Sequence, residues 1–147
     1  MTTDFDSLLD EIKEDDRARV AAERRARQGF AGDCKSLIAE TIRPYFERVA
    51  AGFAGDDVLQ VAPPASGEDN ATLAAVNQRD GRTYELSYRC AYPSLEMTII
   101  VRHPIGGRLE HGGSPRRLTI ETLSAEDIVG QIEDFLRYAL RGVGRQF

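Results

Sequence analysis

The sequence predicts an α+β two-layer sandwich, in which an antiparallel meander of about four to five strands is covered on one face by helices. Three observations lead to this class. Residues 71–103 alternate apolar and polar side chains through two turn signals. Residues 34–52 and 124–141 carry apolar side chains at helical spacing, and residues 4–28 form a further, highly charged helical segment. A chain of 147 residues is one domain by length, so we expect an α+β core over residues 33–141 with the charged helix at its periphery.

The N-terminal helical segment combines a short apolar stripe with segregated charge. The stripe has four members and then fades, which disfavours a long coiled coil. Residues 1–16 carry seven acids and one lysine, whereas residues 17–27 carry five arginines and one glutamate. Two such helices laid antiparallel would match acid to base, which predicts a homodimer contact; a solvated charged helix is the alternative. The predicted partner-binding residues are Phe5, Leu8, Leu9, Ile12, Arg24 and Arg25.

The next helix should begin after a glycine-containing interruption. Residues 29–32, Gly-Phe-Ala-Gly, break the helical pattern, and Asp33 is a candidate N-cap. Helix 34–52 has a broad apolar stripe that suits a helix lying on a sheet. Pro44 lies within it and should kink the helix about one turn earlier, because the proline ring clashes with the carbonyl four residues back. Two shorter helices that break before the proline are the alternative.

Two turns organise the central meander. The Asp-Gly pair at residues 80–81 is typical of a two-residue hairpin turn, because both central positions favour a positive φ. This turn would place Tyr84 opposite Asn77. The Pro-Ser pair at residues 93–94 forms the second turn and would place Tyr84 opposite His103. Both registers bury the same face, so the sequence predicts a three-stranded meander.

Further elements flank the meander. Residues 58–62 form a short strand that two prolines end, which places it at an edge of the sheet. Residues 116–121 form another strand, and the glycine-rich segment before them has room for a small hairpin around residues 108–110. The last helix should begin with Ser124 as its N-cap and Asp127 in a capping box.

Composition limits the partners and the compartment. The formal net charge of −5 and the pI of about 5.1 disfavour non-specific binding to nucleic acid or to anionic membranes. The acidic start has no apolar core segment, so we expect no secretory signal, and no run approaches the ~20 apolar residues of a membrane span. Cys34 in a helix and Cys90 on a strand occupy unlike contexts. We therefore expect no disulfide and a cytoplasmic protein.

The strongest hint of a ligand is the loop that follows the meander. No catalytic motif and no metal-ligand spacing occurs in the sequence, so we expect no metal and no cofactor. Residues 104–117 are rich in glycine and basic side chains, and exposed amides with arginines can hold an anion. An ordinary surface loop is the alternative. The candidate ligand-binding residues are Arg102, His103, Arg108, His111, Arg116 and Arg117.

These patterns favour a non-enzymatic interaction module, such as an adaptor, chaperone-like or regulatory small protein, that binds itself or another protein. The second hypothesis is a small anionic-ligand-binding protein or enzyme with a pocket between the sheet and loop 104–117. Such a pocket would be lined by Tyr84, Tyr88, His103 and His111. The third is a nucleic-acid-associated regulator that uses the arginines of residues 17–27, although the acids directly before them would repel phosphates.

Overall fold

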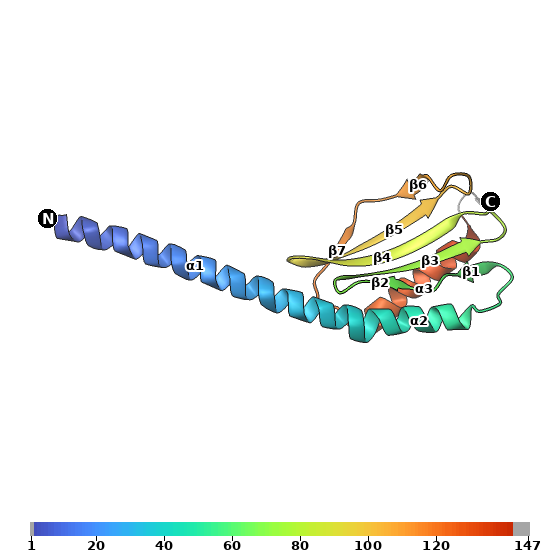
Figure 1. The fold of residues 1–147 in the computed structure, drawn as a ribbon, viewed down its shortest axis with the longest axis horizontal. Helices are drawn as coiled ribbons and strands as arrows, with labels where there is room; N and C mark the ends of the chain where they lie inside the picture. Colours follow the sequence, from blue (N-terminus) through green and yellow to red (C-terminus); the bar gives the residue numbers. More distant parts are fainter. Residues whose placement is uncertain (1, 143–147) are drawn as a thin grey trace.

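Helices and one antiparallel sheet make up the fold (Figure 1). The computed structural model describes residues 2–142. The helical elements are α1 (Thr2–Leu37), the π-helical turn η1 (Ile38–Ile42), α2 (Arg43–Gly52) and α3 (Ala125–Arg141). The strands are β1 (Leu59–Val61), β2 (Ala65–Ser66), β3 (Asn70–Asn77), β4 (Thr83–Ala91), β5 (Ser94–Arg102), β6 (Leu109–Gly112) and β7 (Arg116–Leu118). The predicted α+β class is confirmed.

The sheet is built outward from its central strand, β4. The strand order is β1-β3-β4-β5-β6, with β2 also paired to β3 and β7 also paired to β5. Each edge is therefore shared by two short strands. Strand β1 lies at an edge, as the two prolines after it predicted. The short strands β2 and β6 are additional to the four to five strands expected.

The first hairpin, β3–β4, buries the predicted face in a register shifted by two residues. Tyr84 lies opposite Ala75 instead of Asn77. The turn is the longer loop 78–81, because the Asn77 amide donates to the carbonyl of Arg82 at 3.0 Å. The Asn77 side chain also accepts hydrogen bonds from two amides of this loop and donates to a carbonyl of α3 at 2.7 Å. A buried asparagine thus shapes the turn and ties it to the last helix.

The second hairpin, β4–β5, is shifted in the same way. Its turn lies one residue earlier than predicted and contains Tyr92 and Pro93, which are joined by a cis peptide bond. Tyr84 lies opposite Val101, and His103 lies just beyond β5. Because strand side chains alternate with a period of two, a shift by two residues keeps each side chain on its predicted face.

The helical segment from α1 to α2 contains no break at the glycines of residues 29–32, so the predicted helix end there is wrong. The disturbance lies further along, at η1, where the Arg43 amide donates to the carbonyl of Ile38 five residues earlier. This turn directly precedes Pro44, whose ring has no amide to donate and clashes with the preceding turn of an α-helix. The kink predicted for the proline is accommodated as a π-helical turn.

The core lies between one face of the sheet and the helices. Tyr84, Tyr88 and Phe46 are its largest fully buried side chains. The Tyr88 hydroxyl donates to Oε1 of Gln131 on α3 at 2.6 Å, and burial raises the pKa of Tyr88. Helix α3 begins after Ser124 with the predicted reciprocal capping box. The Tyr88–Gln131 hydrogen bond thus helps to fix how α3 lies against the sheet.

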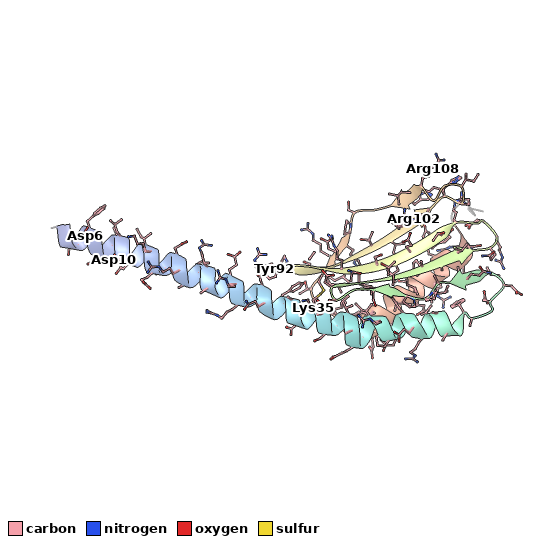
Figure 2. The ribbon with its side chains drawn as sticks, in the orientation of Figure 1. Asp6, Asp10, Lys35, Tyr92, Arg102 and Arg108 are labelled. Carbon is pink, nitrogen blue, oxygen red and sulfur yellow. A yellow bond between two sulfur atoms is a disulfide. The ribbon has the colours of Figure 1, made fainter. Side chains whose placement is uncertain are left out.

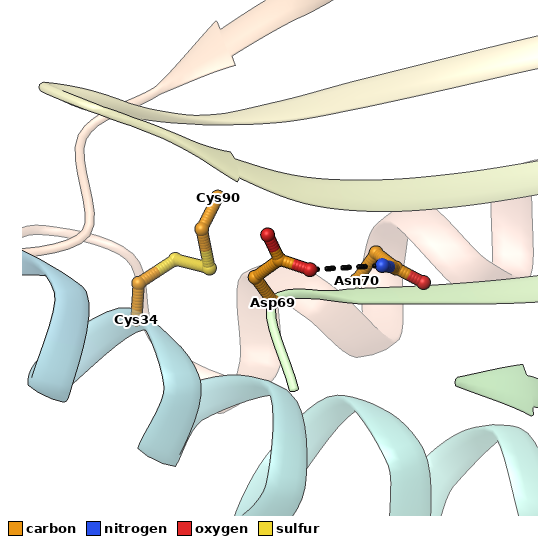
Figure 3. Close-up of a disulfide and its surroundings, with 4 residues drawn as sticks. All are labelled: Cys34, Asp69, Asn70 and Cys90. Atoms are coloured by element: carbon orange, nitrogen blue, oxygen red, sulfur yellow. Dashed lines mark hydrogen bonds between the residues drawn. A yellow bond between two sulfur atoms is a disulfide. The ribbon is translucent and has the colours of Figure 1, made fainter. Parts of the chain in front are cut away.

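A disulfide joins Cys34 of α1 to Cys90 of β4, and the two Cα atoms are 6.1 Å apart (Figure 3). The prediction of unpaired cysteines is wrong. Because α1 continues past the glycines, Cys34 reaches the end of β4, where Cys90 faces the helix. Disulfides are typical of oxidising compartments. The cytoplasmic location, which depended on unpaired cysteines, stays a prediction without that support.

Candidate interaction site

The N-terminal part of α1 projects from the body of the molecule as an arm, which we define as residues 4–26 (Figure 1). At 1.5 Å per residue the arm is ~35 Å long. Figure 2 shows Asp6 and Asp10 far from the sheet. The apolar side chains of the predicted stripe are 61, 47, 40 and 56 % exposed, in the order Phe5, Leu8, Leu9 and Ile12. An apolar stripe that its own chain leaves uncovered is a candidate interaction surface.

Charge along the arm is divided between its two halves. Residues 4–16 hold seven acids and one lysine, and residues 17–26 hold four arginines and one glutamate, so their formal charges are −6 and +3. Ion pairs within the arm, such as Arg17–Glu14 at 2.7 Å, are exposed and contribute at most about 1 kcal/mol each. Arg24 and Arg25 form no ion pair within residues 2–142.

The arm meets the body at a clamp, which we define as the contacts of α1 with the β4–β5 turn and β4. The Arg27 guanidinium lies over the Tyr92 ring, 4.7 Å from its centroid. Phe30 packs edge-on against the same ring at a centroid distance of 5.4 Å. One turn later the Cys34–Cys90 disulfide follows. Figure 2 shows Tyr92 beside α1 where the arm leaves the body.

The stripe and the clamp lie on the same side of α1. Phe30 follows Phe5 by 25 residues, and Cys34 follows Leu9 by the same number. This spacing is about seven turns of 3.6 residues, so these side chains share one helix face. The β4–β5 turn therefore lies on the same face of α1 as the stripe, 15 residues beyond Ile12.

The six predicted ligand-binding residues divide into two groups along β5. One group, Arg116 and Arg117, lies on β7, where Arg116 pairs with Met97 in the middle of β5. Arg102 is five residues further along β5, which corresponds to ~16 Å. The structure does not bring the six residues together in one site. The group at the C-terminal end of β5 consists of Arg102, His103, Arg108 and His111.

Carboxylates offset part of the positive charge of the group at the C-terminal end of β5. Arg102 forms an ion pair with Glu85. Arg82 donates two hydrogen bonds to Glu110, at 2.6 and 3.0 Å, and these bonds are the main reason that the pKa of Glu110 is lowered. His103 accepts a hydrogen bond from the Ile105 amide at Nδ1. Glu85 and Glu110 thus offset the charges of Arg102 and Arg82, whereas Arg108 forms no ion pair within residues 2–142.

Arg116 and Arg117 line an open cleft of about 520 Å³ between β7 and α3. Glu126, Asp127 and Asp134 also line the cleft, so its charges are mixed. Tyr84 and Tyr88, which were expected to line a ligand pocket, are fully buried. A second cleft of about 400 Å³ between α2 and α3 is largely apolar and is lined by Tyr45, Arg48, Val49, Gly52, Phe53, Val129 and Ile132.

Sequence reasoning found the stripe of the arm but missed the clamp. The 25-residue spacing between Phe5 and Phe30 was the signal that could have placed both on one face. The partner of Phe30, the Tyr92 ring, depends on the long-range approach of a hairpin turn to a helix.

Wider comparisons add no homologue. No family model, curated protein or solved structure matches the chain. Among the described residues, no group of three or more His, Cys, Asp or Glu side chains could hold a metal ion. Within the same residues, every helix is too short or too polar to cross a bilayer.

Proposed function

We propose that the protein is a non-enzymatic interaction module that forms a homodimer through its arm. The observation that carries the proposal is the uncovered stripe of Phe5, Leu8, Leu9 and Ile12. Full burial of one such side chain contributes about 1.5–3 kcal/mol. Half of that for the eight side chains of two arms gives on the order of 6–12 kcal/mol, which is comparable to the 4–15 kcal/mol that association costs. Apolar burial therefore roughly offsets the cost of association, and the net affinity must come from the complementary charges of the two arms.

Charge favours a second copy of the chain as the partner and determines the direction of pairing. Parallel arms would place the −6 segment against an identical segment. Antiparallel arms place acidic residues near the arginines of the other copy, and opposite charges both attract and orient the two surfaces. In this arrangement the body of each copy takes no part in the dimer contact. The bodies can then bind another protein, as an adaptor, chaperone-like or regulatory role requires.

Sedimentation equilibrium tests the proposal. The full chain should sediment as a reversible dimer whose dissociation constant rises with salt, because exposed charges are screened. The double substitution Leu8→Ser/Leu9→Ser should yield a monomer with an unchanged circular dichroism spectrum. Val129→Ser, which alters an exposed apolar side chain of the body, is the matched control and should leave the dimer intact. A monomeric full chain, or a dimer unaffected by the arm substitutions, would contradict the proposal.

A further inference from the structure

We infer that the two arms of the dimer pair antiparallel in one register, in which residue i of one copy lies opposite residue 30 − i of the other. This register rests on the proposed homodimer and specifies its contact surface. It follows from three features of the chain: the position of the clamp, the distribution of apolar side chains along the arm, and the positions of its charges.

The clamp limits how far a second arm can extend along α1. From Arg27 onward, the side of α1 that carries the stripe is occupied by Tyr92. A second helix lying on the stripe must therefore begin before Arg27, which leaves residues 4–26 for contact. Two identical segments overlap completely when residue 4 of one lies opposite residue 26 of the other. A further slide meets the β4–β5 turn. A much shorter overlap that lays stripe on stripe also covers the apolar side chains, but it sets the acidic residues 4–11 of one copy against those of the other.

This register also accounts for Val20, the remaining exposed large apolar side chain of the arm. Val20 is 39 % exposed and lies beyond the predicted stripe. In the 30 − i register, Leu9 of one copy lies beside Val20 of the second copy. Leu8 lies opposite Ala22 of the second copy. Val20 and Ala22 therefore flank the leucines from the two borders of the contact face, while Asp16, Arg19 and Glu23 lie along its middle.

The charges of the flanking positions agree with the same register. Asp6 of one copy lies opposite Arg24 of the second copy, and Glu11 lies opposite Arg19. Residues 4–11 have a formal charge of −4, from four acids, and face residues 19–26, in which three arginines and one glutamate give +2. Asp15 lies opposite its own copy at the two-fold axis, so one like-charged pair opposes this arrangement.

Pairwise cysteine cross-linking under mild oxidation tests the register, with the native disulfide left intact. One chain carries Leu9→Cys and a second, larger tagged chain carries Val20→Cys. The mixture should form a cross-linked heterodimer, whereas each variant alone should form none. The matched control pairs Phe5→Cys with Val20→Cys, which are five residues (~7.5 Å) out of register, and should cross-link far less.

The Asp15→Asn substitution gives a second readout. Because this removes one exposed like-charged pair, the dissociation constant should fall about twofold at low salt and less at high salt. Three results would overturn the register while leaving the homodimer intact. The Leu9→Cys variant could cross-link to itself, the Phe5→Cys control could cross-link efficiently, or Asp15→Asn could weaken the dimer. A monomer in sedimentation would overturn both.

Discussion

Reduction of the Cys34–Cys90 disulfide should lower the free energy of unfolding by about 4 kcal/mol. The two cysteines are 56 positions apart. In the chain-entropy relation, closing a loop of that size removes about 14 cal/mol/K from the unfolded ensemble, which is about 4 kcal/mol at 25 °C. The loop contains η1, α2 and the strands β1 to β3 and most of β4. The bond therefore constrains more than a third of the chain in its unfolded state.

Urea titration followed by circular dichroism, with and without a phosphine reductant, measures this difference. Protein concentration must be held constant, because dimer formation also stabilises the folded state. The double substitution Cys34→Ala/Cys90→Ala is the control: it should match the reduced protein within about 1 kcal/mol and should not respond to reductant. Thiol titration of the untreated, denatured chain should find no free thiol.

Hydrogen exchange locates the effect of reduction. The contacts of Arg27 and Phe30 with Tyr92 persist without the disulfide and contribute about 0.5–1.5 kcal/mol each. Amides of α1 near residues 29–34 should therefore exchange faster on reduction, while those of β4 outside the clamp change in proportion to global stability. A loss of stability below about 1 kcal/mol would refute the loop-closure reasoning.

Three further predictions concern the body. Asn77→Ala should lower stability by about 2–3 kcal/mol, because it leaves a buried carbonyl of α3 and loop amides without partners; in urea titrations the exposed control Gln78→Ala should stay within about 0.5 kcal/mol. Arg82 lowers the pKa of Glu110, so their pair stabilises the fold above the ordinary glutamate pKa and this contribution is lost as the pH falls through the lowered value. Carboxyl NMR titration should show the Glu110 midpoint rising in Arg82→Gln, and an unchanged midpoint would contradict the assigned cause. Ser124→Ala should cost about 1 kcal/mol in the same urea assay through loss of the α3 cap.

The predictions that succeeded depended on local pattern. Alternation over β4 and β5 identified the buried face, and Ser124 with Asp127 identified the start of α3. The first register was wrong because the Asp-Gly signal at residues 80–81 was taken as the whole turn, and the second because its turn was placed one residue too late. Asn77 bonds to a carbonyl of α3, 62 residues later, and a preference set by such a distant partner is invisible in the local sequence.

The helix break predicted at residues 29–32 failed for a related reason. A glycine inside a helix costs only about 1 kcal/mol relative to alanine, and Phe30 and Cys34 anchor this stretch to the hairpin and to β4. The same continuity explains the missed disulfide, because a helix that ended before Cys34 gave no reason to place it near Cys90. Of the candidate sites, the stripe on the arm could be read from spacing, whereas the separation of Arg102 from Arg116 required the sheet topology.

The π-helical turn determines the rotational phase between the arm and the body. Cys34, Ile38, Ile42 and Phe46 are all fully buried, at constant four-residue spacing. On a regular α-helix each step of four residues rotates the side chain by about 40°, since one residue turns by about 100°. The π-helical turn at η1 has more residues per turn, so it rotates the chain less per residue and reverses part of this drift. The four side chains therefore all point toward the sheet. Deleting one residue there would restore a regular helix and rotate everything before it by about 100°, which would turn Phe30 away from Tyr92 and Cys34 away from Cys90. One extra residue thus sets the direction in which a surface 26 to 33 positions away faces.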